Sequence, residues 1–402
     1  MPASYENLVK LRNKEIPLGG IEDEVSKFLD PALQNYNDTW DKIENMHKRI
    51  LSDDFRFAHP DSFGNGWIYN WFCMDHVGYD YNPRHRDMGY HNIYDRYLEI
   101  LDKYGRYKDD VQFHFHPMSH YKEANRAGKS YEHSNTLYQI LSRRIIDREF
   151  FPAAFRAGCV TERPDANWFL EQWIPFDCSN FAVEDHNKEM HKDQKNGQAG
   201  DWRRAPHDWS IYHPDIYDYQ VPGSCHRTIG RFLNIVSRYG NITSAEVEKA
   251  FKRANEGTPT LLGMFNHDFR DMGKEAEYVQ SILQPIAAKY PDVKFKYSRV
   301  KDAFNAVLNQ EEQPLELDIK LNGENLEVHC TKGKVFGPQP YLAVKTIDGR
   351  YIHDNFDFGL DGKSWFYVFN ENMIRLNDID TIGIAANNET GYTFVKTIKV
   401  NA

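Results

Sequence analysis

The sequence has few cysteines, no long apolar run and no cluster of basic residues, and each absence excludes a class of protein. Its 402 residues include 5 cysteines, an odd number, widely spaced and without a Cys-x-x-Cys pair, which is typical of free thiols in a reducing compartment. No apolar run approaches the roughly 20 residues of a membrane helix, and the N-terminus lacks the layout of a signal peptide. Since the formal net charge is −10, a phosphate-backbone partner is disfavoured. We therefore expect a cytoplasmic protein with no membrane span and no nucleic-acid partner.

What the sequence does contain, over residues 61–310, is an alternation of apolar strand-like runs with amphipathic segments. Strands are predicted at residues 67–73, 111–116, 153–156 and 260–266. Thr243 and Glu246 form a capping box for a helix that runs to Asn255. Alternation of this kind predicts an α/β layer or barrel with mainly parallel strands, whose active residues lie at the carboxyl ends of the strands.

The two ends of the chain have a different character. Residues 1–60 contain two charged, helix-like segments, at 22–33 and 38–51, which predict an N-terminal helical extension. Beyond a polar linker at 310–314, residues 315–402 alternate with period two between Asn-Gly and Asp-Gly turns, which predicts a C-terminal β-sandwich. Its function stays open between a sugar-binding module and a structural or oligomerising cap.

Three histidines lie close together at the end of one predicted strand, in the run Gln112-Phe-His114-Phe-His116-Pro-Met-Ser-His120. His114 and His116 share a strand face because side chains two residues apart point the same way. A turn at Pro117 could aim the rings of His116 and His120 at one point. Neutral imidazole nitrogens bind Zn²⁺ and its relatives. The cluster therefore predicts a divalent metal site. The alternatives are a surface group of histidines and core histidines that only satisfy each other.

Other polar residues end or follow the same predicted strands. Asp75 follows the first strand, Arg156 ends the third and His267 follows the fourth. This set suits hydrolysis, because a metal lowers the pKa of bound water, a carboxylate accepts the water proton and a separate imidazole protonates the leaving group.

The order of these motifs resembles that of the polysaccharide deacetylase family, carbohydrate esterase family four, whose members remove N-acetyl or O-acetyl groups from sugars. The resemblance covers about residues 65–308 and implies an irregular (β/α) barrel with a metal at its mouth. The matching segments are Met74-Asp75-His76, His116-Pro-Met-Ser-His120, Phe155-Arg156-Ala-Gly158, Asp177 with the downstream Trp202-Arg-Arg-Ala-Pro206, and Phe265-Asn-His267-Asp268.

Carried over residue by residue, the resemblance implies a metal site, a general acid and two further residues. His267 would be the general acid, Arg156 would orient a carboxylate and Asp177 would be a supporting residue. Zinc is the expected ion, although this kind of ligand set also permits nickel, cobalt, iron or manganese. The metal ligands would be Asp75, His116 and His120, with His114 as a further candidate.

The sequence departs from the family pattern where two adjacent acids are usual, because Asp75 is followed by His76. Either Asp75 is the base and His76 replaces the acidic ligand, or Asp75 binds the metal and the base is another residue, such as Asp80 or Asp268. A third possibility is a site that binds metal or sugar without hydrolysis. The histidine motif also departs, because it lacks the usual Ser or Thr after its first histidine.

The substrate expected from the resemblance is an acylated sugar. Aromatic residues make up 14% of the chain, and such rings can both stack on sugars and hydrogen-bond to them. Trp202, His207, Trp209 and Tyr212 are the predicted substrate-binding residues. We therefore expect removal of an acyl group, N-acetyl by family expectation, from a sugar or glycan precursor of surface polysaccharide. The alternatives are a non-catalytic carbohydrate-binding protein and a hydrolase of non-sugar amides.

Overall fold

The computed structural model describes residues 5–20, 22–23, 26, 37, 39–75, 92–116, 131, 137–184, 200–236 and 240–400. Its α-helices are α1 (Tyr5–Arg12), α3 (Trp40–Ile50), α4 (Asp53–Arg56), α5 (Asn92–Tyr104), α6 (Leu137–Arg148), α7 (Pro164–Trp173), α9 (Ser244–Asn255), α10 (Met272–Lys289) and α11 (Val300–Leu308). Its strands are β1 (Asn70–Asp75), β2 (Asp110–Phe115), β3 (Ala154–Ala157), β4 (Phe176–Asn180), β5 (Thr228–Asn234), β6 (Gly263–Phe265), β7 (Glu316–Asn322), β8 (Asn325–Lys332), β9 (Tyr341–Thr346), β10 (Tyr351–Asp354), β11 (Asp357–Phe358), β12 (Ser364–Val368), β13 (Ile379–Asn387) and β14 (Thr393–Lys399).

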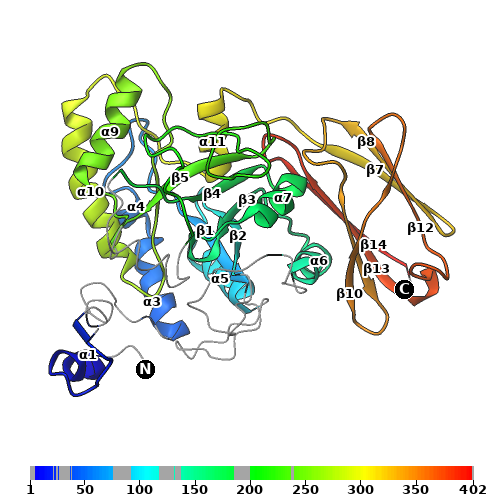
Figure 1. Ribbon diagram of the computed structural model, residues 1–402, viewed down its shortest axis with the longest axis horizontal. Coiled ribbons are helices and arrows are strands. Elements are labelled where there is room, and N and C mark those ends of the chain that lie inside the picture. The colour runs from blue at the N-terminus through cyan, green and yellow to red at the C-terminus, as the bar shows by residue number, and fades with distance from the viewer. Residues whose placement is uncertain are drawn as a thin grey trace.

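Strands β1 to β6 form one curled parallel sheet, a half-barrel, in which the spatial order of the strands follows the chain (Figure 1). The predicted α/β architecture with parallel strands is confirmed. The four predicted strands correspond to β1, β2, β3 and β6, with boundaries shifted by up to three residues. Strands β4 and β5 were not predicted.

Amphipathic helices cover the outer face of the half-barrel. Helix α5 buries Tyr97 and Leu101 in the same apolar cluster as Trp71 and Cys73 of β1. At the start of α9, Oγ1 of Thr243 accepts a hydrogen bond from the backbone N–H of Glu246 at 3.3 Å, which confirms half of the predicted capping box. The apolar contact fixes α5 against β1, and the capping hydrogen bond fixes the start of α9.

Helix α11 closes the amino-terminal end of the half-barrel. Its Phe304 stacks on Phe176, the first residue of β4, with ring centroids 4.8 Å apart. The backbone N–H of Val300 donates to Oδ1 of Asn70, the first residue of β1, at 2.8 Å. Because this end is closed, the carboxyl ends of the strands are the place for a site.

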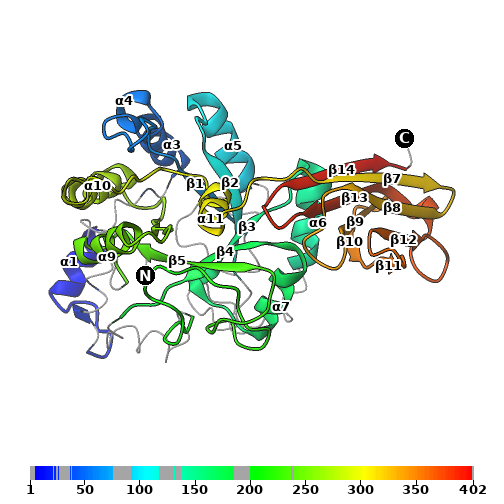
Figure 2. The same ribbon diagram turned by 90° about the horizontal axis from the view of Figure 1, so that it is seen from above.

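The C-terminal region consists of two antiparallel sheets, β10-β9-β13-β14 and β11-β12-β8-β7. Both contribute to one apolar core, which contains Val328 and Trp365 from one sheet and Val344 and Ile384 from the other. This is the face-to-face packing expected of a β-sandwich. The two sheets lie beside the half-barrel, on the side opposite α9 and α10 (Figures 1 and 2).

The N-terminal region is helical where the structure describes it. Helix α3 falls within the predicted segment 38–51 and begins after Thr39, whose side chain accepts from the backbone N–H of Lys42. The predicted helix at residues 22–33 lies mostly outside the described residues. Within the part of the chain that the structure describes, no helix combines the length and apolar character needed to cross a membrane.

His353 of β10 joins the sandwich to the half-barrel. Its ring stacks between Tyr341 of β9 and Tyr138 of α6, with centroids 4.1 and 4.8 Å away. Its Nδ1 lies 2.9 Å from the backbone oxygen of Leu342, so Nδ1 carries a proton and donates. Burial lowers the pKa of His353 from 6.5 to about 4.

This buried imidazole predicts a loss of stability in acid. The unfolded chain binds a proton at His353 as the pH falls below about 6.5, whereas the folded chain does so only near 4, so stability is lost between these values. The full effect is at most about 3 kcal/mol. Urea unfolding from pH 7 to pH 4.5 should show a shallower loss for His353→Gln than for the parent. Equal slopes would contradict the assignment.

Candidate active site at the carboxyl end of the half-barrel

A cavity of about 1040 Å³ lies between β1 and β6, the two edge strands of the half-barrel. Apolar and aromatic side chains form most of its lining, and they include Trp40, Trp67, Phe72, Phe232 and Phe265. At the carboxyl ends of the strands the lining becomes polar. The residues there are His114, His116, Arg156, His267 and Asp268.

His114 and His116 approach each other through their Nε2 atoms. In the pairing of β2 with β3, His114 lies opposite Arg156, and its Nδ1 is 2.7 Å from the Arg156 backbone oxygen. Because a carbonyl oxygen only accepts, Nδ1 carries the proton and Nε2 presents its lone pair. Nε2 of His116 lies 2.9 Å from that atom, with the two ring planes at 86°, and therefore carries a proton that it donates to Nε2 of His114. Two imidazole nitrogens therefore converge on one point.

The electrostatic surroundings keep His114 neutral. The side chain is buried, and burial lowers its pKa well below 6.5; the nearby His116 and Arg156 add to the effect because they disfavour a second positive charge. His267 contributes in the same direction. A neutral imidazole with a fixed tautomer has the form that a metal ligand requires.

Gly158 allows the ring of His116 to sit at the end of β3. A Cβ atom at this position would lie 2.5 Å from Cγ of His116. The next two residues, Cys159 and Val160, have positive φ angles of 51° and 49°, which is unusual for a β-branched residue. Nε1 of Trp202 donates to the backbone oxygen of Val160 at 2.7 Å and so helps to hold this turn.

The close approach predicts a coupled effect of two substitutions. Gly158→Ala should destabilise the parent by about 1–3 kcal/mol, because the new methyl group collides with the His116 ring. In a His116→Ala background the ring is absent, so the same change should cost much less. Urea unfolding of the four proteins in this cycle measures the difference. An equal cost in both backgrounds would mean that the ring does not lie against residue 158.

Arg156 and His267 complete the described polar end of the cavity. The Arg156 side chain is 7% exposed, and its guanidinium lies over the Phe265 ring, 3.7 Å from the centroid. Burial lowers its pKa to about 10, so it stays charged at neutral pH. His267 lies between Phe265 and Phe269, with ring centroids 6.0 and 5.3 Å away.

The other predicted metal ligands lie partly or wholly outside the described residues. Asp75 is the last residue of β1, where its backbone lies opposite Phe115; its side chain, and all of His76, Asp80 and His120, lie outside the described residues. Within the described ranges, no group of three or more His, Cys, Asp or Glu side chains is placed to hold a metal ion. The described part of the site thus supplies two converging imidazoles.

Asp268, the alternative base that the sequence offers, lies on the cavity wall. Its Oδ2 accepts a hydrogen bond from the hydroxyl of Tyr97 at 2.7 Å. Tyr97 belongs to α5, and the neighbouring Trp40 belongs to α3. Neither ring was identified from the sequence, because only the folded chain brings these two helices to the cavity.

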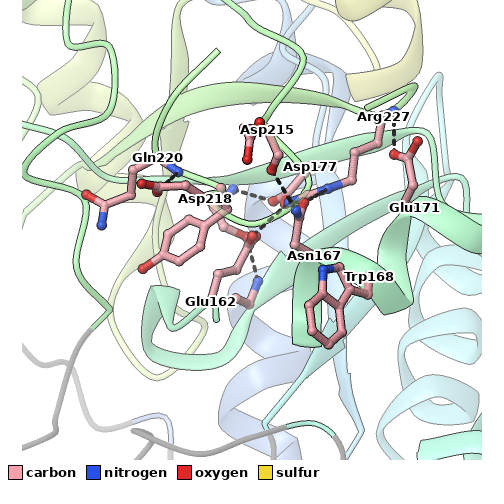
Figure 3. A network of polar contacts seen from close by, with 12 residues as sticks. Glu162, Asn167, Trp168, Glu171, Asp177, Asp215, Asp218, Gln220 and Arg227 are labelled. Atoms are coloured by element: carbon pink, nitrogen blue, oxygen red, sulfur yellow. Dashed lines mark hydrogen bonds and ion pairs between the residues drawn. The ribbon is translucent and has the colours of Figure 1, made fainter. Parts of the chain in front are cut away.

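Asp177 lies away from this cavity, in a buried cluster of charges (Figure 3). Its carboxylate forms an ion pair with Nη1 of Arg227, and Nη2 of Arg227 lies 3.0 Å from Oε2 of Glu162. Nε of Arg227 also donates to Oδ1 of Asn167 at 2.8 Å. The structure therefore does not bring Asp177 together with the histidines, and no sequence motif marked Glu162 or Arg227.

The predicted substrate-binding rings also lie elsewhere. Trp202, Trp209 and Tyr212 are buried in the hydrophobic core and do not line the cavity. Nε1 of Trp209 donates to the backbone oxygen of Glu246 at 3.0 Å, and the Tyr212 hydroxyl donates to the backbone oxygen of Tyr219 at 2.7 Å. His207 is exposed and outside the cavity lining. In this structure these rings have no surface to offer a ligand in the cavity.

Comparisons with models of known protein families, with curated proteins and with solved structures gave no match. The resemblance to polysaccharide deacetylases therefore rests on the motifs of the sequence.

Proposed function

We propose that this chain is a metal-dependent hydrolase of the polysaccharide deacetylase type, which removes an acyl group, in particular N-acetyl, from a sugar or glycan precursor. The observation that carries the proposal is the pair His114 and His116, whose Nε2 atoms lie 2.9 Å apart at the carboxyl end of a parallel half-barrel. Arg156 and His267 line the same cavity. The proposal also implies that the half-barrel is a barrel of the polysaccharide deacetylase type.

The residues present fit a divalent ion. Zinc binds imidazole nitrogens at about 2.0–2.1 Å. The two Nε2 atoms, which are 2.9 Å apart and share a proton, would release that proton and separate slightly to hold one ion. The Nδ1–H of His114 donates to a backbone oxygen, as is usual for histidines that bind metals. The proposed remaining ligands are Asp75 and His120. Nickel, cobalt, iron and manganese suit the same ligands.

The proposed chemistry divides the work between the ion and the side chains. A bound divalent ion would polarise the acyl carbonyl and lower the pKa of water. His267, at the end of β6, would hold a proton for the leaving amine or alcohol. With Asp75 as a ligand, the proposed base is Asp268, which accepts from the Tyr97 hydroxyl. In the alternative arrangement Asp75 is the base and His76 replaces it as a ligand. Both acids belong to segments at the same end of the half-barrel.

A non-catalytic carbohydrate-binding protein is the second candidate. It is favoured by one observation, the aromatic side chains of the cavity lining, which include Trp40 and Trp67. Such rings can stack on a sugar without any hydrolysis.

Acetate release separates the two candidates. Purified protein is incubated with N-acetylglucosamine, its oligomers and an N-acetyl amino acid, before and after treatment with a chelator. We expect acetate from a sugar substrate, loss of activity on chelation and recovery when Zn²⁺ or Co²⁺ is added. Acetate from the amino acid alone would place the substrate outside the sugars. Sugar binding without acetate release from any compound would support the second candidate.

A further inference from the structure

The guanidinium of Arg156 differs from those of most other buried arginines in what it faces. Six arginine side chains are buried among the described residues, and four of them contact a carboxylate. The four pairs are Arg56 with Asp109 at 2.6 Å, Arg227 with Asp177, Arg231 with Glu246 at 2.7 Å and Arg270 with Glu275 at 2.5 Å. The fold therefore usually compensates a buried guanidinium with an acid of its own.

Arg156 has no such acid in the described part of the chain. No ion pair joins it to any described carboxylate, and its buried Nε has no hydrogen-bond partner there. One face of its guanidinium lies over Phe265. The neighbouring Cys178 stays uncharged, because burial raises the pKa of its thiol well above 9. A buried charge without a counter-charge is costly, so this arrangement points to a partner that is not part of the described chain.

The cavity around Arg156 suits a negative group. His114, His116 and His267 line the same end of the cavity as Arg156. The described part of the lining contains three acids. Asp268 accepts from Tyr97, Asp302 of α11 pairs with Arg299 at 2.7 Å, and Asp292 is exposed to solvent. A guanidinium in such surroundings binds a carboxylate or a phosphate through two parallel hydrogen bonds.

We propose that Arg156 binds an anionic group of the substrate, so that the acylated sugar is an acidic one, carrying a carboxylate or a phosphate. This inference rests on the proposed function for the identity of the sugar, but not for the anion site itself. It is an alternative to the role implied by the family resemblance, in which Arg156 orients a carboxylate.

Binding measurements test the anion site independently of hydrolysis. Titration calorimetry compares neutral N-acetylglucosamine with N-acetylglucosamine 1-phosphate and N-acetylglucosaminuronic acid, which separate phosphate from carboxylate as the source of the charge. We expect at least one acidic sugar to bind about tenfold or more tightly than the neutral one. In Arg156→Met this preference should disappear. Arg156→Lys keeps the positive charge but loses the planar guanidinium that makes two parallel hydrogen bonds. This variant should retain only part of the preference for the acidic sugar.

Two further variants test whether Arg156 is the residue that binds the anion. Lys296 also lines the cavity, and Lys296→Met should leave the preference unchanged if the site is Arg156 itself. His116→Ala should abolish acetate release but keep the preference for the acidic sugar, because the anion is bound by Arg156 and not by a metal. Equal binding of acidic and neutral sugars to the parent would overturn the inference even if acetate is released. A preference that depends on Arg156, in a protein that releases no acetate, would uphold it while the proposed function failed.

Discussion

Replacing Arg227 by methionine is expected to lower the free energy of unfolding by about 3–5 kcal/mol. Arg227 has no exposed surface and contacts Asp177, Glu162 and Asn167 (Figure 3). Without its guanidinium, two buried acids would remain in contact with no positive charge between them. Urea unfolding followed by tryptophan fluorescence measures the loss. A change below about 1 kcal/mol would contradict the role assigned to this cluster.

Glu162→Gln is the matched control for this prediction. Burial and the nearby Asp177 raise the pKa of Glu162 well above 4.5, so the folded chain keeps this carboxyl protonated at pH values where the unfolded chain has released the proton. Glu162 therefore lowers the free energy of unfolding as the pH rises above about 4.5. A glutamine resembles the protonated acid, and Glu162→Gln should unfold with equal or greater free energy at pH 7. A loss comparable to that of Arg227→Met would show that Glu162 is charged.

His267→Gln is expected to reduce turnover by roughly 10²–10⁴-fold, the range for removal of a general acid. His267 lies at the cavity beside Phe265 and Phe269, where an amide can keep a hydrogen bond but cannot deliver a proton at neutral pH. Since the change affects the transition state more than substrate binding, kcat should fall while KM changes little.

The leaving group of the substrate distinguishes this role from a structural one. A substrate whose leaving group needs no proton should be cleaved by His267→Gln almost as fast as by the parent. His207→Gln is the control, because His207 is exposed and outside the cavity lining. An unchanged kcat in His267→Gln would remove this residue from the mechanism.

The strands that the sequence predicted are those with continuous apolar or alternating patterns. Strands β4 and β5 lack such patterns because buried polar residues interrupt them. Asp177 and Ser179 of β4 are buried through contacts with Arg227 and the backbone N–H of Ala157. In β5, Arg231 is buried by its ion pair with Glu246. In each case a partner that is distant in the sequence compensates the cost of burying the polar side chain. No local sequence pattern reveals that partner.

Part of the candidate site could be predicted for a topological reason. Carboxyl ends of parallel strands meet at one edge of a sheet, so histidines and an arginine at successive strand ends were expected together, and His114, His116, Arg156 and His267 line one cavity. The aromatic residues of the cavity could not be predicted in this way, because amino-acid composition does not distinguish a ring in the hydrophobic core from a ring that binds a ligand. Trp202 proved to be fully buried.

Metal content is the measurement that tests the central claim most directly. The protein is purified without a histidine tag, and bound metals are quantified for the parent and for the His116→Ala, His120→Ala double variant. Because His116 and His114 present converging nitrogens, we predict about one divalent ion per parent chain, as for a catalytic site, and its loss from the double variant. A parent that binds no metal, even after addition of Zn²⁺ or Co²⁺, would contradict the account.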